Sequence, residues 1–217
     1  MLRFKINKEK GFPLNVLCLG AHCDDIEIGC GGTILRLISE NKDTNINWIV
    51  FASNKERAVE AKKSAQIFLA DAIQKDIVIK QYRDSFFPYI GEEIKTFFEE
   101  VKKNIKPDII FTHYRNDLHQ DHRLISELTW NTFRCHFILE YEVIKYDGDL
   151  GSPNFIIPIE KQLCKKKIRT IINCFKSQSG RHWFTEDTFF SMMRIRGVEG
   201  CCEEGFAEAF YCRKILM

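Results

Sequence analysis

Four apolar runs stand out in the first half of the chain, and each is followed by a stretch with helical spacing. The runs are continuous rather than alternating, which is typical of strands buried on both faces of a parallel sheet. We expect these strands at residues 15–20, 47–52, 76–81 and 107–114. Apolar residues recur every three or four positions between them, which predicts helices at 31–40, 55–70 and 91–104, and one from 119–122 toward 133.

The pattern is less regular after residue 130. Here we expect strands at 138–146, 154–159 and 205–211 and helices at 160–175 and 186–196. Alternating strands and helices predict an α/β fold. We therefore expect a single three-layer αβα domain over residues 1–217, with a Rossmann-like, mostly parallel sheet in strand order 3-2-1-4-5 and a C-terminal extension.

Composition narrows the class of protein. The chain has 217 residues, of which 45% are hydrophobic and 29% charged, as in a soluble globular domain. Its net charge of +2 is spread along the chain and gives no case for a nucleic-acid partner, and the basic run 165–167 predicts a solvated helix face. There is no apolar run long enough to span a bilayer, and the N-terminal stretch 1–12 does not resemble a secretory signal. We expect a cytoplasmic protein without a membrane span.

The first cluster of chemistry follows the first strand, at His22, Cys23, Asp24 and Asp25. Two adjacent carboxylates beside an imidazole repel one another unless a cation or a proton intervenes, and a divalent metal is the simplest such cation. On this stretch alone, an acidic turn that caps a helix is an equal alternative. The glycine-rich segment 29–32 lacks the spacing of a nucleotide-binding loop, so we interpret it as a link that lets the helix pack closely on the strand.

A second cluster follows the fourth strand, within residues 113–123, and contains His119, Asp121 and His122. Side chains three positions apart lie on one face of a helix. In strand order 3-2-1-4-5 the first and fourth strands are neighbours where the order reverses, so both clusters meet at the carboxyl end of the sheet. Two histidines and a carboxylate, with one position left to water, are the donors of a catalytic zinc site.

At these residues the sequence resembles the PIG-L or LmbE-like family of zinc-dependent N-deacetylases, whose hallmarks are AHPDDE and a later HxDH box. The matching segments here are AHCDDIE and HQDH. Weaker similarity extends through RxxE at 57–60, RDSFFP, KPDIIFTH, SQSGR, RG at 196–197 and FAEAF. Three departures are specific: Cys23 replaces the usual Pro, Ile26 stands at the usual Glu, and Glu27 comes one place late.

The resemblance implies a role for each matching residue. It makes His22, Asp25 and His122 the ligands of Zn2+, with another divalent metal such as Fe2+ as an alternative. It makes Asp24 the general base, His119 the group that stabilises the oxyanion and protonates the leaving amine, and Asp121 the partner that orients His119.

Two further positions, Arg57 and Asp84, follow the second and third strands at the same end of the sheet. They are suited to hydrogen-bond sugar hydroxyls or a phosphate, although membership of a surface ion pair explains Arg57 equally well. Glu208 in FAEAF matches a family position, and a strand residue that faces a neighbouring basic side chain explains it equally well.

The implied activity is hydrolysis of the N-acetyl group of an amino sugar or sugar conjugate, of the N-acetylglucosamine type. The expected partner is a small N-acetylated sugar, a sugar nucleotide or a glycoconjugate. One alternative is a hydrolase of another small N-acyl amide that uses the same metal site. A second is a sugar-binding module whose catalytic site has decayed, but the presence of every ligand together with Asp24 and His119 argues against it.

Overall fold

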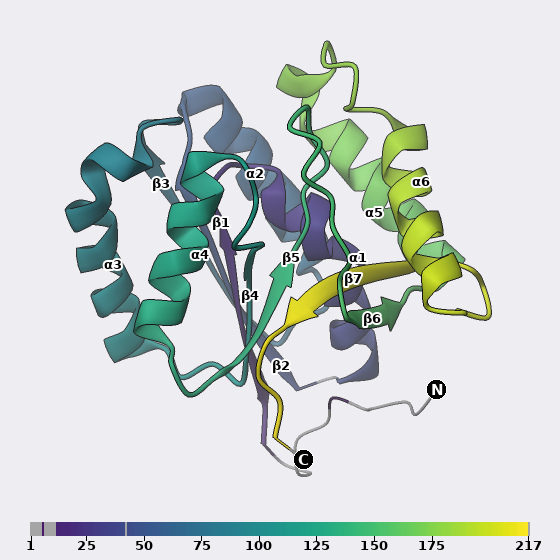
Figure 1. The fold of residues 1–217 in the computed structure, drawn as a ribbon, viewed down its shortest axis with the longest axis horizontal. Helices are drawn as coiled ribbons and strands as arrows, with labels where there is room; N and C mark the ends of the chain where they lie inside the picture. Colours follow the sequence, from purple (N-terminus) through teal and green to yellow (C-terminus); the bar gives the residue numbers. More distant parts are fainter. Residues whose placement is uncertain (1–5, 7–11, 42, 217) are drawn as a thin grey trace.

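The computed structural model describes residues 6, 12–41 and 43–216 of the chain and shows a sheet between two helical layers (Figure 1). Within these residues the sheet has seven strands in the order β3-β2-β1-β4-β5-β7-β6. The first five are parallel, and β7 runs antiparallel to both β5 and β6. The predicted order 3-2-1-4-5 with a C-terminal extension is therefore confirmed. The strands are β1 (Leu14–Gly20), β2 (Thr44–Ala52), β3 (Gln74–Tyr82), β4 (Ile109–His113), β5 (Phe137–Tyr141), β6 (Phe155–Pro158) and β7 (Ala207–Cys212).

Helices cover both faces of the sheet and create two separate cores (Figure 1). Helices α3 and α4 pack on one face, whereas α1, α2, α5 and α6 pack on the other. The helices are α1 (Asp25–Glu40), α2 (Lys55–Phe68), α3 (Gly91–Asn104), α4 (Gln120–Thr132), α5 (Lys161–Cys174) and α6 (Glu186–Glu199), with short 3-10 turns η1 (Phe87–Ile90) and η2 (Lys176–Gln178).

The first helix begins earlier than the sequence predicts. It starts at Asp25, so the segment 29–32 lies inside the helix, and its interpretation as a link is wrong. The glycines are needed for close packing: a Cβ on Gly29 would lie 2.1 Å from the ring of Tyr141, and one on Gly32 would lie 2.9 Å from Oε1 of Glu208. Glycine disfavours a helix by about 1 kcal/mol, but here it lets other elements approach the helix backbone.

The fifth strand is shorter than the sequence predicts. It ends at Tyr141 rather than at residue 146, and residues 142–154 form a loop that leads to β6. This loop carries Glu142 and Lys145, whose side chains form ion pairs with Arg196 and Asp117 in other parts of the chain. These tertiary contacts replace the strand pairing that the apolar pattern suggested.

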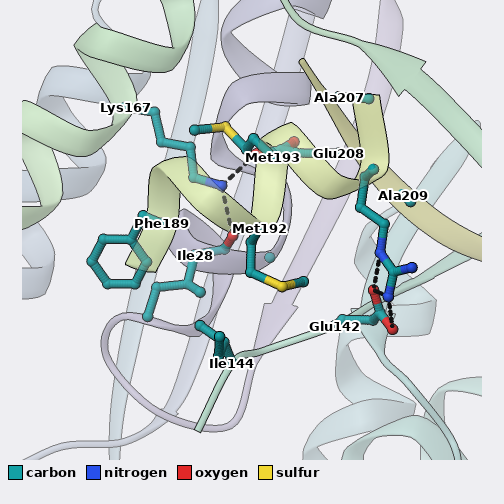
Figure 2. A pocket seen from close by; sticks show the side chains of 12 residues that line it. Ile28, Glu142, Ile144, Lys167, Phe189, Met192, Met193, Ala207, Glu208 and Ala209 are labelled. Atoms are coloured by element: carbon teal, nitrogen blue, oxygen red, sulfur yellow. Dashed lines mark hydrogen bonds and ion pairs between the residues drawn. The ribbon is translucent and has the colours of Figure 1, made fainter. Parts of the chain in front are cut away.

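An ion pair between Lys167 of α5 and Glu208 of β7 is buried beside α1 (Figure 2). The Lys167 ammonium lies 2.6 Å from Glu208 Oε1 and donates to the carbonyl of Ile28 at 2.6 Å. Glu208 also accepts hydrogen bonds from the backbone amides of Gly32 and Thr33, at 2.8 and 2.7 Å. The prediction of a solvated face at 165–167 is therefore wrong for Lys167. The expectation that Glu208 faces a neighbouring basic side chain is confirmed.

We expect Glu208→Gln to lower the free energy of unfolding by about 3–5 kcal/mol, because it leaves the buried Lys167 ammonium without its counter-charge. The Glu208 carboxylate accepts hydrogen bonds from the Lys167 ammonium and two backbone amides, so the NH2 group of a glutamine would face a donor instead of an acceptor. Urea unfolding measures the change, with Glu99→Gln as the control, because Glu99 pairs with Lys95 at the surface and its loss should change the free energy of unfolding far less than the loss of Glu208. Equal stability of the two variants would contradict this role of the buried pair.

Among the described residues, no helix has the length and apolar character needed to cross a membrane. The N-terminal stretch 1–11, apart from Ile6, lies outside the described residues. The absence of a secretory signal and the cytoplasmic location therefore stay predictions.

Candidate metal centre

The two chemical clusters meet at the carboxyl ends of β1 and β4. These strands are paired in register, with Val16 opposite Ile109, and the strand order reverses between them. Segment 20–25 links β1 to α1, segment 113–120 links β4 to α4, and a third loop, residues 83–87, approaches from β3. The topology thus delivers side chains from three loops to one point, as the sequence predicts.

Three donor atoms form a small triangle at this point. Nδ1 of His22 lies 3.1 Å from Nε2 of His122, and Oδ2 of Asp25 lies 3.3 Å from the first and 3.5 Å from the second. All three residues are buried. Ligands at about 2.0–2.1 Å in a tetrahedral zinc site are roughly 3.3 Å apart, so the donor set and its spacing fit a divalent metal.

The charges around the triangle also favour a cation. Burial alone disfavours an imidazolium, yet the carboxylates of Asp25, Asp121 and Asp84 raise the pKa of His22 well above its usual value. Conversely, the three histidines around Asp25 hold the pKa of its carboxyl well below its usual range in spite of burial. The carboxylates around His22 therefore favour positive charge on this side of the site, and Asp25 stays ionised beside it.

The other nitrogen of His22 faces two carboxylates. Nε2 lies 3.1 Å from Oδ1 of Asp84 and 3.3 Å from Oδ2 of Asp121. Asp121 also accepts hydrogen bonds from the backbone amides of Ser85 at 2.7 Å and Phe87 at 3.1 Å. Ser85 has a φ of 68°, which is a strained conformation for a residue with a side chain. The hydrogen bond from its backbone amide to Asp121 holds it in this conformation. Asp121 thus positions His22 and the loop that carries Asp84.

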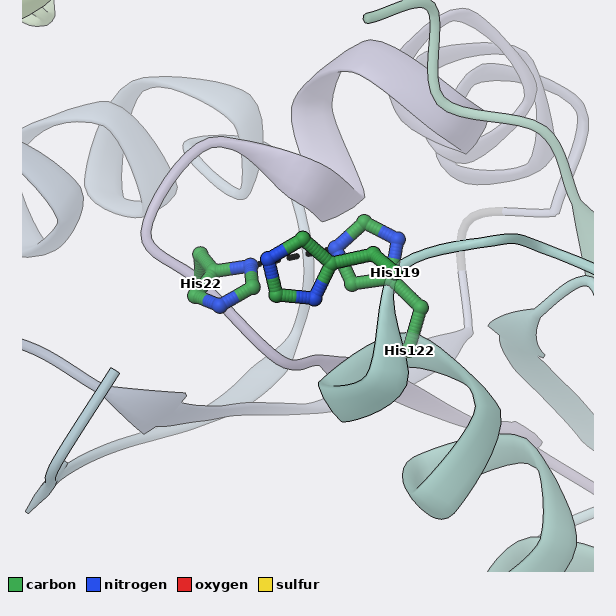
Figure 3. Close-up of side chains that lie close together, drawn as sticks. All are labelled: His22, His119 and His122. Carbon is green, nitrogen blue, oxygen red and sulfur yellow. Dashed lines mark hydrogen bonds between the residues drawn. The ribbon is translucent and has the colours of Figure 1, made fainter. Parts of the chain in front are cut away.

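His119 lies beside the triangle, with its ring centre 4.8 Å from that of His22 and 4.7 Å from that of His122 (Figure 3). Its Nδ1 accepts a hydrogen bond from the backbone amide of Asp121 at 3.2 Å, which caps α4. Burial and the nearby His22 lower the pKa of His119. The ring is therefore neutral with its proton on Nε2, and its contact with Asp121 is through the backbone rather than through the predicted carboxylate.

Asp24 stays outside the triangle and pairs with Arg57 of α2. Nη2 of Arg57 donates to Oδ1 of Asp24 at 2.7 Å, and both side chains are largely buried. Burial raises the pKa of the Asp24 carboxyl, although the guanidinium opposes that shift. Arg57 is thus an ion-pair member, but the pair lies in the site and not at the surface as the alternative interpretation expected, and substrate binding by Arg57 stays a prediction.

Cys23, which stands where the family usually has proline, points away from the donors. Its fully buried thiol donates to the carbonyl of Ala52 at 3.4 Å. Burial raises the pKa of the Cys23 thiol to about 12, so it stays protonated and unreactive near neutral pH. Glu27 is also fully buried, and burial raises the pKa of its carboxyl well above the usual value, which favours the neutral acid.

His113 and Asp117 are site residues that the sequence analysis did not assign. Nε2 of His113, at the end of β4, lies 3.2 Å from Oδ2 of Asp25 and accepts the amide of Ala21 at 2.9 Å. Oδ2 of Asp117 lies 2.9 Å from Nδ1 of His122. Both residues lie within or next to the second cluster, so their position in the sequence was a usable signal.

Comparison with known proteins adds an independent line of support. The family model described as PIG-L, GlcNAc-PI de-N-acetylase, matches residues 17–133, which is more than half of the chain. The chain belongs to the PIG-L family. The match includes both chemical clusters, so the resemblance inferred from AHCDDIE and HQDH is confirmed.

Solved structures share the PIG-L fold over nearly the whole chain. The N,N'-diacetylchitobiose deacetylase from Pyrococcus horikoshii is 19% identical, with a TM-score of 0.66 over 91% of this chain and 83% of the other. A zinc-inhibited form of teicoplanin deacetylase Orf2 is 11% identical, with a TM-score of 0.68 over 91% and 97%. GalB, the 4-carboxy-2-hydroxymuconate hydratase from Pseudomonas putida KT2440, is 14% identical, with a TM-score of 0.73 over 94% and 98%. The fold therefore supports more than one kind of chemistry.

Proposed function

We propose that this PIG-L protein is a metal-dependent hydrolase that removes the N-acetyl group from an amino sugar or a sugar conjugate. The observation that carries the proposal is the triangle of His22, Asp25 and His122 with a separate carboxylate, Asp24, beside it. The family description as a de-N-acetylase and the deacetylases among the structural neighbours support it.

The metal in this proposal is held by Nδ1 of His22, Nε2 of His122 and Oδ2 of Asp25. A divalent ion there lowers the pKa of water and polarises a carbonyl group. We propose Zn2+, with Fe2+ as the alternative. Zinc inhibition of the neighbouring teicoplanin deacetylase is a reason to test both ions with this protein.

Asp24 accepts the proton of the attacking water in this mechanism. Its ion pair with Arg57 counteracts the effect of burial and keeps the carboxylate oriented. Because the backbone caps Nδ1 of His119, that residue acts through its Nε2–H as a hydrogen-bond donor to the acetyl oxygen as negative charge develops there. Asp24 has by then gained a proton from the water. We therefore propose that Asp24 delivers this proton to the leaving amine.

Two groups at the edge of the site are proposed to bind the sugar. The Asp84 side chain is 61% exposed, although Oδ1 lies 3.1 Å from Nε2 of His22, so it connects the metal site with the surface. Nε of Arg57 is buried and has no hydrogen-bond partner among the described residues. A hydroxyl or phosphate oxygen of the substrate would satisfy that donor.

The proposal is tested by incubating the purified protein, loaded with Zn2+ or Fe2+, with N-acetylated compounds and measuring acetate. The sugar arm contains N-acetylglucosamine, its β-linked disaccharide, a sugar nucleotide and an N-acetylglucosaminyl inositol conjugate. The second arm contains N-acetyl amino acids. We expect kcat/KM for the best sugar to exceed that for the best N-acetyl amino acid by about 100-fold or more. An amino acid would leave the polar groups that bind the sugar without hydrogen-bond partners, and this cost lowers its kcat/KM.

The outcomes separate the competing functions. Acetate release from amino acids alone would favour the second candidate, a hydrolase of other small amides. Sugar binding without acetate release in either metal form would favour a decayed binding module. Removal of the metal with a chelator should abolish acetate release, and re-addition should restore it, whereas activity in a verified metal-free protein would contradict the proposal.

A further inference from the structure

The two nitrogens of His122 have chemically different surroundings. Nε2 faces the donor triangle, at 3.1 Å from His22 Nδ1 and 3.5 Å from Asp25 Oδ2. Nδ1 faces Asp117 Oδ2 at 2.9 Å. An ionised carboxylate only accepts hydrogen bonds, so Nδ1 carries the proton and Nε2 keeps its lone pair toward the triangle. The tautomer of His122 therefore depends on the placement of Asp117.

Asp117 is fixed at both of its oxygens. While Oδ2 accepts from His122, Oδ1 accepts from the backbone amide of His119 at 2.8 Å and from Nζ of Lys145 at 3.0 Å. Asp117 is only 2% exposed. A buried carboxylate is costly unless a cation offsets its charge. The Lys145 ammonium contacts the Asp117 carboxylate itself, whereas the Arg123 guanidinium donates to the backbone carbonyl of Asp117 at 3.1 Å.

Lys145 comes from the 142–154 loop, far from Asp117 in the sequence. Its ammonium lies 2.6 Å from Asp149 Oδ2, 3.0 Å from Asp117 Oδ1 and 3.6 Å from Asp147 Oδ2. These three carboxylates have the geometry of a cation site, and the ammonium of Lys145 lies within reach of all three. Asp149 also accepts the backbone amide of Leu118 at 2.7 Å, which joins the loop to the segment before α4.

The base of the loop is closed by a second buried ion pair (Figure 2). Arg196 of α6 donates to both carboxylate oxygens of Glu142, and its Nη2 also donates to the carbonyl of Gly151 at 3.0 Å. Glu142 in turn accepts the amide of Gly151 at 3.0 Å. The two ends of the segment 142–151 are thus held together, so Lys145 is presented to Asp117 from a closed loop.

We infer that Lys145 is a positioning residue for the metal centre, which acts by fixing Asp117 as the hydrogen-bond acceptor of His122. Loss of the ammonium leaves Asp117 with an uncompensated charge next to Asp149, and the two carboxylates repel. Asp117 then shifts, and His122 loses the partner that holds its Nε2 lone pair toward the triangle. The inference rests on the proposed function for its consequence in catalysis, but its effect on the His122 tautomer is independent of any activity.

The test compares wild type with Lys145→Met in two measurements. Two-bond 15N–1H NMR spectra of the metal-free protein report which ring nitrogen of His122 is protonated, and we expect the variant to lose the uniform Nδ1–H form. Titration with Zn2+ against a fluorescent chelator should show affinity about 10–100-fold weaker than in wild type, the usual cost of losing a group that orients a metal-binding histidine. The control is Lys95→Met, because Lys95 pairs with Glu99 at the surface and lies outside the site.

A double-mutant cycle separates positioning from a general effect on the fold. If Lys145 acts through Asp117, Lys145→Met should weaken Zn2+ binding little further in an Asp117→Asn background. Additive effects, or an unchanged tautomer with Zn2+ affinity within about twofold of wild type, would overturn the inference. If Lys145→Met does not fold, Lys145→Arg and Lys145→Gln replace it in the test. The arginine variant should keep the Nδ1–H tautomer of His122, and the glutamine variant should lose it. Equal behaviour of the two variants would overturn the inference. A wild-type protein that binds neither Zn2+ nor Fe2+ contradicts the proposed function, while the tautomer measurement still decides the role of Lys145.

Discussion

Replacing Asp24 with asparagine is expected to lower kcat for N-acetyl hydrolysis by about 100- to 10,000-fold while the protein keeps its metal, the range typical of losing a general base. Asparagine has the shape of aspartate and still accepts a hydrogen bond from Arg57, which now lies 2.7 Å from Asp24 Oδ1. It cannot take a proton from water. Steady-state acetate release and metal content by mass spectrometry, measured on the same preparation, check both halves of the prediction.

The control for the asparagine variant is Asp71→Asn, which makes the same chemical change at an exposed position of the chain. Its activity and metal content should equal those of wild type. Full activity of Asp24→Asn would show that another group moves the proton. Loss of metal from the same variant would show that Asp24 belongs to the ligand set.

Hydrophobic patterning was sufficient to predict most of the architecture. Strands that are buried on both faces, such as β1 and β4, produce continuous apolar runs, whereas β3 at the edge of the sheet has no fully buried residue. The order 3-2-1-4-5 is one of the common arrangements of such α/β sheets. Prediction failed where tertiary contacts outweigh local preference. The helix from Asp25 runs through glycines at 29, 31 and 32, which local propensity treats as a break, because other side chains need the space against its backbone.

The candidate site was predictable to the extent that its residues lie next to strand ends. His22, Asp25 and His122 follow β1 and β4 closely, so the topology alone brings them together. Lys145 carried no such signal, because its partner Asp117 lies on another loop. The predicted contact between Asp121 and His119 depended on side-chain direction, which spacing in the sequence does not determine: the Asp121 carboxylate faces His22 instead.

The structural neighbours show why the donor residues matter more than the fold in assigning a reaction. A hydratase and deacetylases share this architecture with similar coverage of the chain. A fold alone therefore leaves the reaction open. What favours the proposed hydrolysis of an amide here is the combination of a donor triangle whose spacing fits a divalent metal, a carboxylate outside it and the Nε2–H donor of His119 beside it.

Asp25→Ala is expected to remove both metal and activity, in contrast to the Asp24 variant. Oδ2 of Asp25 is one corner of the donor triangle and also accepts the backbone amide of His22 at 2.6 Å. Without this carboxylate, the two remaining ring nitrogens lack a negative partner. We expect the affinity for Zn2+ to fall by more than about 100-fold, beyond the usual cost of losing a group that only orients a ligand.

Competition with a fluorescent chelator measures the affinity of the Asp25 variant for Zn2+, and acetate release measures its activity, with Asp71→Ala as the control at an exposed carboxylate. The comparison with Asp24→Asn is decisive because the two carboxylates are adjacent in the sequence, whereas their partners differ. Asp24 pairs with a guanidinium, and Asp25 faces imidazoles. If Asp25→Ala keeps its metal and Asp24→Asn loses it, the two roles are reversed. If both variants lose the metal, Asp24 is a ligand as well, and the proton must be moved by another residue.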